Sequence, residues 1–157
     1  MAGRRPGRTS IGTIVNMVNE LAEQLRPVVM RLSRELRREV RLLGVTAGQV
    51  SLLFTIDRQP GIGVRELAAQ EHVSPAGMSR HVRGLVERGL VRRESDPKDA
   101  RRHGLYATDE GRGVLRQVKR RRAEWLASRL RMLSEEDLEA IRDAVAPLGR
   151  LLDEEYA

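Results

Sequence analysis

The stretch from Val64 to Gly111, VRELAAQEHVSPAGMSRHVRGLVERGLVRRESDPKDARRHGLYATDEG, decides the fold of this 157-residue chain. It holds two short amphipathic helical patterns joined by a tight turn, and then two short strand patterns separated by a polar, arginine-bearing loop. That order predicts a helix-turn-helix followed by a β-hairpin wing. Such a unit presents one helix to the DNA major groove and one loop beside it, so the stretch indicates recognition of a polyanion.

Long helical patterns flank this stretch on both sides. Apolar residues recur at steps of three or four over residues 11–43, which predicts one amphipathic helix that Pro27 is expected to kink or divide. A solitary helix of this length is stable only if its apolar stripe packs against something, and a partner chain is one source of that surface. The capping pattern at Thr46 predicts a second helix, and Pro60 ends it. Two further helices are expected over about 109–133 and after Ser134.

The chain is therefore expected to be mainly α with a small β-hairpin wing. A winged helix-turn-helix core would be flanked by long N- and C-terminal dimerisation helices. We expect a disordered basic tail at 1–10, an N-terminal dimerisation and linking helix at 11–45, a DNA-binding domain at 46–110, and C-terminal linking and dimerisation helices at 111–157.

The second helix of the central stretch is the candidate recognition helix. It should run to about Glu87, with its apolar face inward and a small, basic face outward. Arg80 can reach guanine O6 and N7, and Arg83 can reach a base or a phosphate. Solvated surface charge is the alternative interpretation of both arginines. The candidate DNA contacts on this helix are Ser74, Pro75, Ala76, Gly77, Ser79, Arg80 and Arg83.

The loop between the two strands supplies the candidate wing tip. Asp99 can pair with Arg101 or Arg102 and stiffen the loop, which would present Arg101 to a narrow, A·T-rich minor groove. The remaining basic residues of the hairpin suit backbone phosphates. The alternative is a charged turn kept soluble by its own ion pairs, which are each worth at most about 1 kcal/mol. The candidate wing residues are Arg92, Arg93, Lys98, Asp99, Arg101 and Arg102.

Charge is distributed unevenly along the chain. The net charge is +7, which favours anionic partners. Residues 46–110 carry ten basic and nine acidic residues, 111–122 carry six basic and no acidic residues, and 123–157 carry four basic and nine acidic residues. We infer that the acidic C-terminal helices point away from DNA and form the seam between subunits. The basic run from Lys119 to Arg122 is interpreted as an exposed helix face that contributes long-range attraction.

Composition excludes several functional classes. The chain has no cysteine, which removes disulfides, thiolate zinc sites and cysteine-based redox sensing, and which fits a cytoplasmic location. The three histidines lie far apart, and neither a metal-ligand spacing nor a nucleophile pattern occurs, so we expect no enzyme, metal or cofactor. No apolar run approaches 18 residues, and residues 1–10 lack the apolar segment of a secretory signal, so no membrane association is expected.

The segment Asp96-Pro97-Lys98-Asp99-Ala100-Arg101 resembles the D-P-x-D-x-R wing signature of the MarR family of bacterial transcription regulators. The resemblance extends over nearly the whole chain. Its supporting pieces are Thr46-Ala47-Gly48-Gln49, Val73-Ser74, Leu85-Val86-Glu87-Arg88-Gly89-Leu90-Val91 and Leu105-Tyr106-Ala107-Thr108-Asp109-Glu110-Gly111.

The resemblance implies a homodimer on a pseudo-palindromic operator, with the first helix and the two C-terminal helices of each subunit interlocked. Arg101 would be the wing-tip residue in the minor groove, braced by Asp99. Family members are mostly repressors, and many are released by small phenolic or other aromatic effectors. The aromatic residues available for such an effector are Phe54, Tyr106, Trp125 and Tyr156, and no pocket is assigned. The family's cysteine-based peroxide sensing is excluded, and a low-specificity architectural DNA-binding protein is the alternative function.

Overall fold

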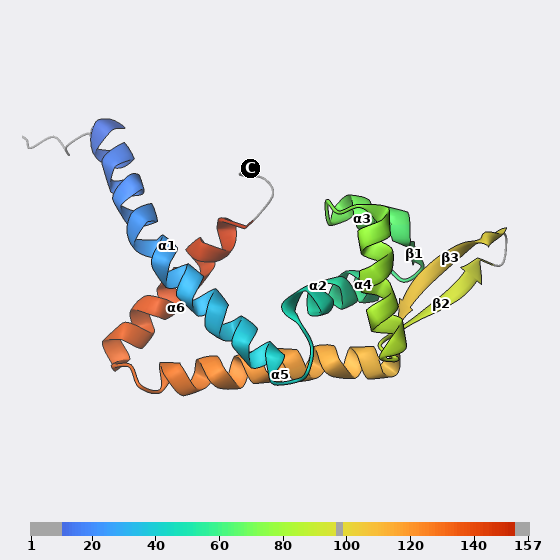
Figure 1. The fold of residues 1–157 in the computed structure, drawn as a ribbon. Helices are drawn as coiled ribbons and strands as arrows, with labels where there is room; N and C mark the ends of the chain where they lie inside the picture. Colours follow the sequence, from blue (N-terminus) through green and yellow to red (C-terminus); the bar gives the residue numbers. More distant parts are fainter. Residues whose placement is uncertain (1–10, 97–98, 153–157) are drawn as a thin grey trace, which may run out of the picture. The chain divides into compact units, whose positions relative to one another are not determined.

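The structure, a computed structural model, describes the backbone of residues 11–96 and 99–152 and the side chains of residues 12–95 and 103–152. Six helices and three strands follow one another in the described part of the chain (Figure 1). They are α1 (Ile11–Arg41), α2 (Ala47–Arg58), β1 (Ile62–Gly63), α3 (Val64–Gln70), α4 (Pro75–Glu87), β2 (Val91–Asp96), β3 (Asp99–Ala107), α5 (Asp109–Leu130) and α6 (Glu135–Arg150). The mainly helical fold with a small β-hairpin wing is confirmed.

Hydroxyl side chains cap the helices where the sequence predicts. The Thr46 hydroxyl accepts a hydrogen bond from the Gln49 amide at 3.2 Å, and the Gln49 side chain accepts one from the Thr46 amide at 3.0 Å. Ser74, Thr108 and Ser134 cap α4, α5 and α6 in the same way. Each cap satisfies an amide that the helix itself leaves unpaired, so local chemistry fixes where these helices begin.

The expectation that Pro27 divides the first helix is wrong. Helix α1 continues through Pro27 as one element of 31 residues. Proline removes one backbone donor from a helix interior, but its fixed φ is itself helical, so the flanking turns continue. The described residues fall into two compact units, the first ending at Arg38 and the second beginning at Glu39.

The sheet has three antiparallel strands in the order β1-β3-β2. Ile62 of β1 pairs with Leu105 of β3, and Val91 of β2 pairs with Ala107 of β3. Both hairpin strands, of six and nine residues, are longer than the two short strands that the sequence predicts. Sequence periodicity identifies only the part of a strand that is half-buried, and the outer part of this hairpin is polar on both faces.

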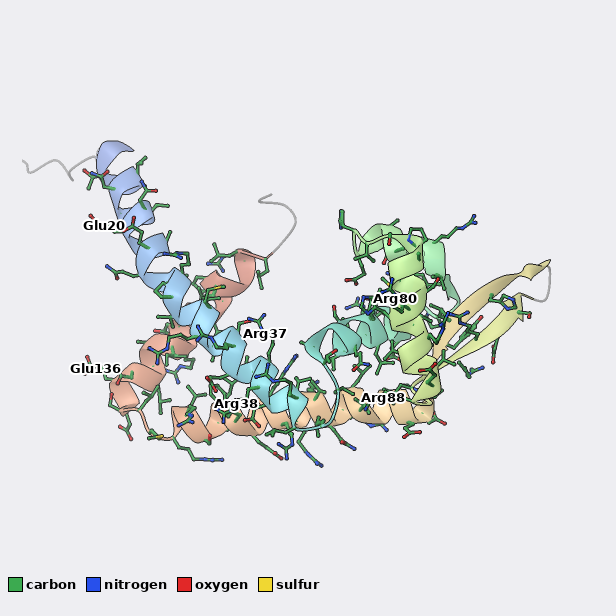
Figure 2. The ribbon with its side chains drawn as sticks, in the orientation of Figure 1. Glu20, Arg37, Arg38, Arg80, Arg88 and Glu136 are labelled. Carbon is green, nitrogen blue, oxygen red and sulfur yellow. The ribbon has the colours of Figure 1, made fainter. Side chains whose placement is uncertain are left out.

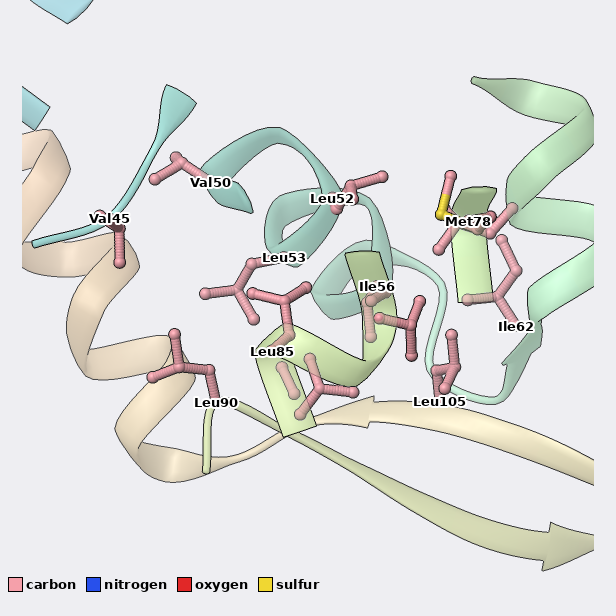
Figure 3. Packing of buried hydrophobic residues seen from close by; sticks show 14 of the residues in the cluster. Val45, Val50, Leu52, Leu53, Ile56, Ile62, Met78, Leu85, Leu90 and Leu105 are labelled. Carbon is pink, nitrogen blue, oxygen red and sulfur yellow. The ribbon is translucent and has the colours of Figure 1, made fainter. Parts of the chain in front are cut away.

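One hydrophobic core lies under the helix-turn-helix and the base of the wing (Figure 3). Its fully buried side chains come from different elements, so α2, α3, α4 and β3 are held by shared packing rather than by isolated pairs. The largest are Leu53, Ile56, Leu67, Met78, Leu85 and Leu105.

Apolar side chains of α1 and α6 remain in contact with solvent. Leu21 on α1 is 60% exposed and Val145 on α6 is 63% exposed. No residue of α6 is buried. None of the helices within residues 11–96 and 99–152 is long and apolar enough to cross a membrane. Exposed apolar stripes of this extent are typical of surfaces that bind another molecule.

Gly111, in the first turn of α5, allows the closest approach in the core. A Cβ at this position would lie 2.2 Å from the Leu90 carbonyl oxygen and 3.1 Å from Leu53 Cδ1. We expect Gly111→Ala to lower the free energy of unfolding by about 1–3 kcal/mol, because the backbone of residue 90 must move. Urea denaturation at fixed protein concentration measures this change.

Gly113→Ala is the matched control, two positions further along the same helix. The nearest atom to its Cβ would be Arg116 Nη2 at 3.7 Å. This substitution should raise the free energy of unfolding by about 0.5–1 kcal/mol, because alanine is the better helix former. Equal effects of the two substitutions would contradict the packing described at Gly111.

Candidate nucleic-acid interface

Helix α4 has one buried face and one exposed basic face. Met78, Val82 and Leu85 point into the core and are at most 1% exposed. Arg80 and Arg83 are both exposed on the opposite side of the helix, and Figure 2 labels Arg80 on α4. Because the core fixes the buried face, the rotation of α4 about its axis is set, and with it the direction in which both guanidinium groups extend.

The start of α4 is an exposed helix N-terminus built from small residues. The Ser74 hydroxyl accepts a hydrogen bond from the Gly77 amide at 3.1 Å, and Pro75 occupies the first turn. A Cβ on Gly77 would lie 3.1 Å from the same Ser74 oxygen. Small residues therefore keep this end of the helix accessible, and the dipole of a helix N-terminus favours a phosphate there.

Hydrogen bonds fix the turn that leads into α4 and join α3 to the end of α2. The turn between α3 and α4 passes through His72 at φ 53, and the Val73 amide then donates to the Ala68 carbonyl at 3.0 Å. The side-chain amides of Gln59 and Gln70 exchange two hydrogen bonds, at 2.9 and 3.3 Å, between the ends of α2 and α3. The helix-turn-helix is thus fixed by polar contacts as well as by its core.

The two arginines of β2 point to opposite faces of the sheet. Side chains alternate along a strand, and Val91 is buried on the core side. Arg93 therefore extends on the core side and Arg92 on the outer face. Arg92 forms an ion pair with Glu94, and its guanidinium carbon lies 5.1 Å from the centre of the Tyr106 ring. This ion pair was not predicted from the sequence, although the alternation of side chains along a strand places Arg92 and Glu94 on the same face.

The wing tip lies largely outside the described residues. Pro97 and Lys98 fall outside them altogether, and for Asp99, Arg101 and Arg102 only the backbone, in β3, is described. The expected pairing of Asp99 with an arginine thus stays a prediction.

A polar junction joins the base of the wing to α2 and α5. Arg112 donates to the Ala107 carbonyl at 3.0 Å and to Asp109 at 2.7 Å, and it lies 3.6 Å from Asp57. The Thr108 hydroxyl donates to the Gly89 carbonyl at 2.6 Å. Arg112 therefore makes its polar contacts within the protein, and its positive charge stabilises the junction rather than binding DNA.

The C-terminal end of α4 is tied to the segment that precedes α2. Arg88 Nη1 donates to the Gly44 carbonyl at 2.6 Å. Gly44 adopts φ 71, a left-handed conformation that favours glycine and ends α1. The contact links the end of α4 to the turn between α1 and α2.

The basic stretch of α5 is partly neutralised by nearby carboxylates. Arg120 lies 3.6 Å from Glu124, and Arg121 lies 3.5 Å from Glu39. These pairs support the interpretation of residues 119–122 as a helix face rather than a binding element.

Two further aromatic rings each lie beneath an arginine. The guanidinium carbon of Arg58 lies 5.7 Å from the ring centre of Phe54, which is 51% exposed, and that of Arg129 lies 5.4 Å from the ring centre of Trp125. Tyr156 falls outside the described residues. In the described ranges, no three histidine, aspartate or glutamate side chains gather as a metal site.

Comparison with known proteins shows a consistent likeness. The model of the MarR family matches residues 45–103. The chain is 34% identical over 134 residues to an HTH-type transcriptional regulator of Mycobacterium tuberculosis, an alignment that covers 85% of this chain and 94% of that protein. It is 25% identical over 122 residues to the HTH-type transcriptional repressor MdtR of Bacillus subtilis, covering 78% of this chain and 79% of that one.

The fold also resembles that of a solved regulator in complex with nucleic acid. The structure of a point mutant of S. aureus MepR bound to an oligodeoxyribonucleotide matches with a TM-score of 0.67 at 18% identity. The match covers 84% of this chain and 97% of that one. At this identity the likeness concerns the fold alone.

The junction around Arg112 predicts a specific response to pH. The hydrogen bond and charge of Arg112 lower the pKa of Asp109. Because the folded-state pKa is depressed, the stabilising contact is present above the ordinary pKa of about 3.8 and is lost as pH falls through the lower, folded-state value. We expect Arg112→Gln to raise the pKa of Asp109, as measured by NMR titration of its carboxyl carbon. An unchanged Asp109 titration would contradict the contact.

Proposed function

This chain belongs to the MarR family of transcriptional regulators, and from that membership we propose that it is a homodimeric, sequence-specific DNA-binding repressor. A small-molecule effector would release it from its operator. Members of the family are regulators rather than enzymes, and the chain is accordingly not an enzyme. We propose that it acts in the cytoplasm, where its DNA target lies.

The exposed basic face of α4 is the single observation that carries the DNA-binding proposal. Arg80 and Arg83 extend from a helix whose opposite face is buried, so the points at which both side chains leave the backbone are set before DNA arrives. Guanidinium groups on such an exposed helix face suit bidentate contacts with guanine. The proposed DNA contacts of α4 are Ser74, Pro75, Ala76, Gly77, Ser79, Arg80 and Arg83.

The wing completes the proposed interface. Arg93 lies on the same side of the hairpin as the core and α4, which suits a phosphate flanking the groove that α4 would enter. Lys98 and Arg102 are proposed as further phosphate contacts, Arg101 as the minor-groove residue and Asp99 as its brace. The junction at Arg112 supports this arrangement because it anchors the base of the hairpin.

The exposed apolar stripes of α1 and α6 support the proposal of a homodimer. Leu21, Val28 and Val145 are each at least 60% exposed. Burying such side chains contributes roughly 1.5–3 kcal/mol each, and a second copy of the chain supplies matching surfaces by twofold symmetry. A symmetric pair would present two copies of α4 to half-sites about 34–36 Å apart, one turn of the duplex.

Repression and effector release rest on the relatives and on exposed aromatic surface. MdtR, one of the relatives, is a repressor. Phe54 offers a half-exposed ring on α2, directly within the unit that would read DNA. Such an effector would bind more tightly to a dimer whose two α4 helices are displaced than to the DNA-binding dimer. The ratio of these two effector affinities would set the largest loss of DNA affinity.

Selection of genomic fragments tests the proposal as a whole. Fragments bound at physiological salt should share an inverted repeat, and the selected site should bind roughly 10³–10⁷ times more tightly than random DNA. A ratio near one would instead favour an architectural DNA-binding protein.

Arg80→Ala tests direct readout by α4. We expect a loss of about 1–3 kcal/mol in binding free energy and a relaxed preference at one base position in each half-site, because one bidentate contact is removed. Titration of the operator and of single-base variants measures both. Arg142→Ala on α6 is the control and should bind as the parent does. Equal losses on all sequences would assign Arg80 to a phosphate instead.

Arg93→Gln tests the phosphate contact of the wing. The slope of log affinity against log salt should become shallower by about 0.9, because one fewer counterion is released from the duplex. Affinity titrations from low to physiological salt give the slope. If the slope equals that of the parent, Arg93 does not contact a phosphate.

A further inference from the structure

We propose that Arg92, Tyr106 and Glu94 form a brace on the outer face of the sheet. In this role Arg92 is a positioning residue: it acts on DNA binding by fixing the direction of the wing, not by holding a phosphate. This inference rests on the proposed function and assigns separate roles to the adjacent arginines of β2.

Strand alternation places the brace away from α4. Arg92 pairs directly with Tyr106 across β2 and β3. Their neighbours Val91, Leu105 and Ala107 are all buried on the other face. Arg92 and Tyr106 must therefore share the outer face, whereas α4 packs on the face that carries the core.

The Tyr106 ring lies over the turn that leads into β1. Gly61 N donates to the Leu105 carbonyl at 2.8 Å, which brings the turn against β3. A Cβ on Gly61 would lie 3.1 Å from the Tyr106 hydroxyl oxygen, and Gly61 adopts φ 89. Glycine at this position thus leaves room for the ring, and Tyr106 covers the link between α2 and β1.

Gly104 of β3 also leaves room for the Tyr106 ring and for the turn at Gly61. A Cβ at Gly104 would lie 2.9 Å from Gly61 Cα and 3.1 Å from Tyr106 Cε2. No side chain fits there, so β3 and the turn approach closely beside the ring. Turn, ring and guanidinium form one row across β1, β3 and β2, with Arg92 as the outermost member.

Glu94 orients the guanidinium at the end of this row. Arg92 and Glu94 are two residues apart on one strand and therefore lie on the same face, where they form an ion pair. A planar guanidinium can stack on an aromatic ring while its edge meets a carboxylate, which a lysine ammonium cannot reproduce. Both of its interactions are made within the protein, so Arg92 is held against the sheet.

The brace matters because β2 is an edge strand of a small sheet. An unbraced hairpin would sample several directions, and that freedom would be lost on binding DNA. A row of contacts across all three strands joins the hairpin to the turn around Gly61 before DNA binds. That turn leads through β1 into α3, the first helix of the helix-turn-helix. The wing and α4 then approach the duplex as one preorganised surface.

Conservative substitutions test the brace on the full-length protein and its selected operator. Arg92→Lys keeps the charge and loses the stack, and Tyr106→Leu removes the ring. We expect each to weaken operator binding by about two- to fivefold with an unchanged salt slope. The double substitution should weaken it no further, because both remove one interaction. Tyr106→Phe should bind as the parent does.

Arg120→Lys is the matched control, since it makes the same exchange in an exposed ion pair with Glu124 on α5, away from the sheet, and it should retain affinity. Thermal unfolding followed by circular dichroism checks that each variant is folded, and Arg92→Lys and Tyr106→Phe keep the test usable if Tyr106→Leu does not fold. Parental affinity of Arg92→Lys, or a slope shallower by about 0.9 in Arg92→Gln, would overturn the brace. Failure of the parent protein to prefer any operator would instead refute the proposed function.

Discussion

The exposed apolar stripes of α1 and α6 are the constraint on which the proposed assembly depends. The core of the described residues runs only from Val40 to Val118, yet apolar stripes continue along α1 and α6. The first turn of α6 is acidic, which stabilises the helix start and repels DNA. Burial of the stripes against a second copy would therefore set both the stability of these helices and the separation of two DNA-reading units.

Within each reading unit, a modest core is reinforced by specific contacts at its joints. The close approach of Gly111 to Leu90 and the hydrogen bonds of Thr108 hold the end of α4, the hairpin and α5 together. Arg88 and Arg112 direct their charge to carbonyl and carboxylate groups of the same unit. Residues 46–110 carry a net charge of only +1. This agrees with two roles for the arginines, since some are paired within the protein and others are available to bind DNA.

Local signals account for the parts of the fold that the sequence predicts well. Hydroxyl residues at Thr46, Ser74, Thr108 and Ser134 cap helices because each interaction lies within three residues along the chain. The buried face of α4 follows from helical periodicity in the same way. The resemblance to the MarR family, visible in the wing signature, agrees with the family membership that the relatives establish.

The remaining features depend on contacts between distant residues or on energy balances that a pattern does not contain. Continuation of α1 through Pro27 reflects the flanking turns, which outweigh one missing donor. The contact of Arg112 with Asp57 joins residues far apart in the chain. The stacking of Arg92 on Tyr106 requires the strand register, which the sequence leaves open.

Sedimentation equilibrium, with and without a duplex that carries the selected inverted repeat, tests the central claim most directly. We expect a free species of twice the 17.7 kDa chain mass and a complex of two chains on one duplex. A species of 17.7 kDa at micromolar concentration, with α1 and α6 fully helical, would contradict the central claim, because the exposed stripes would then need no partner.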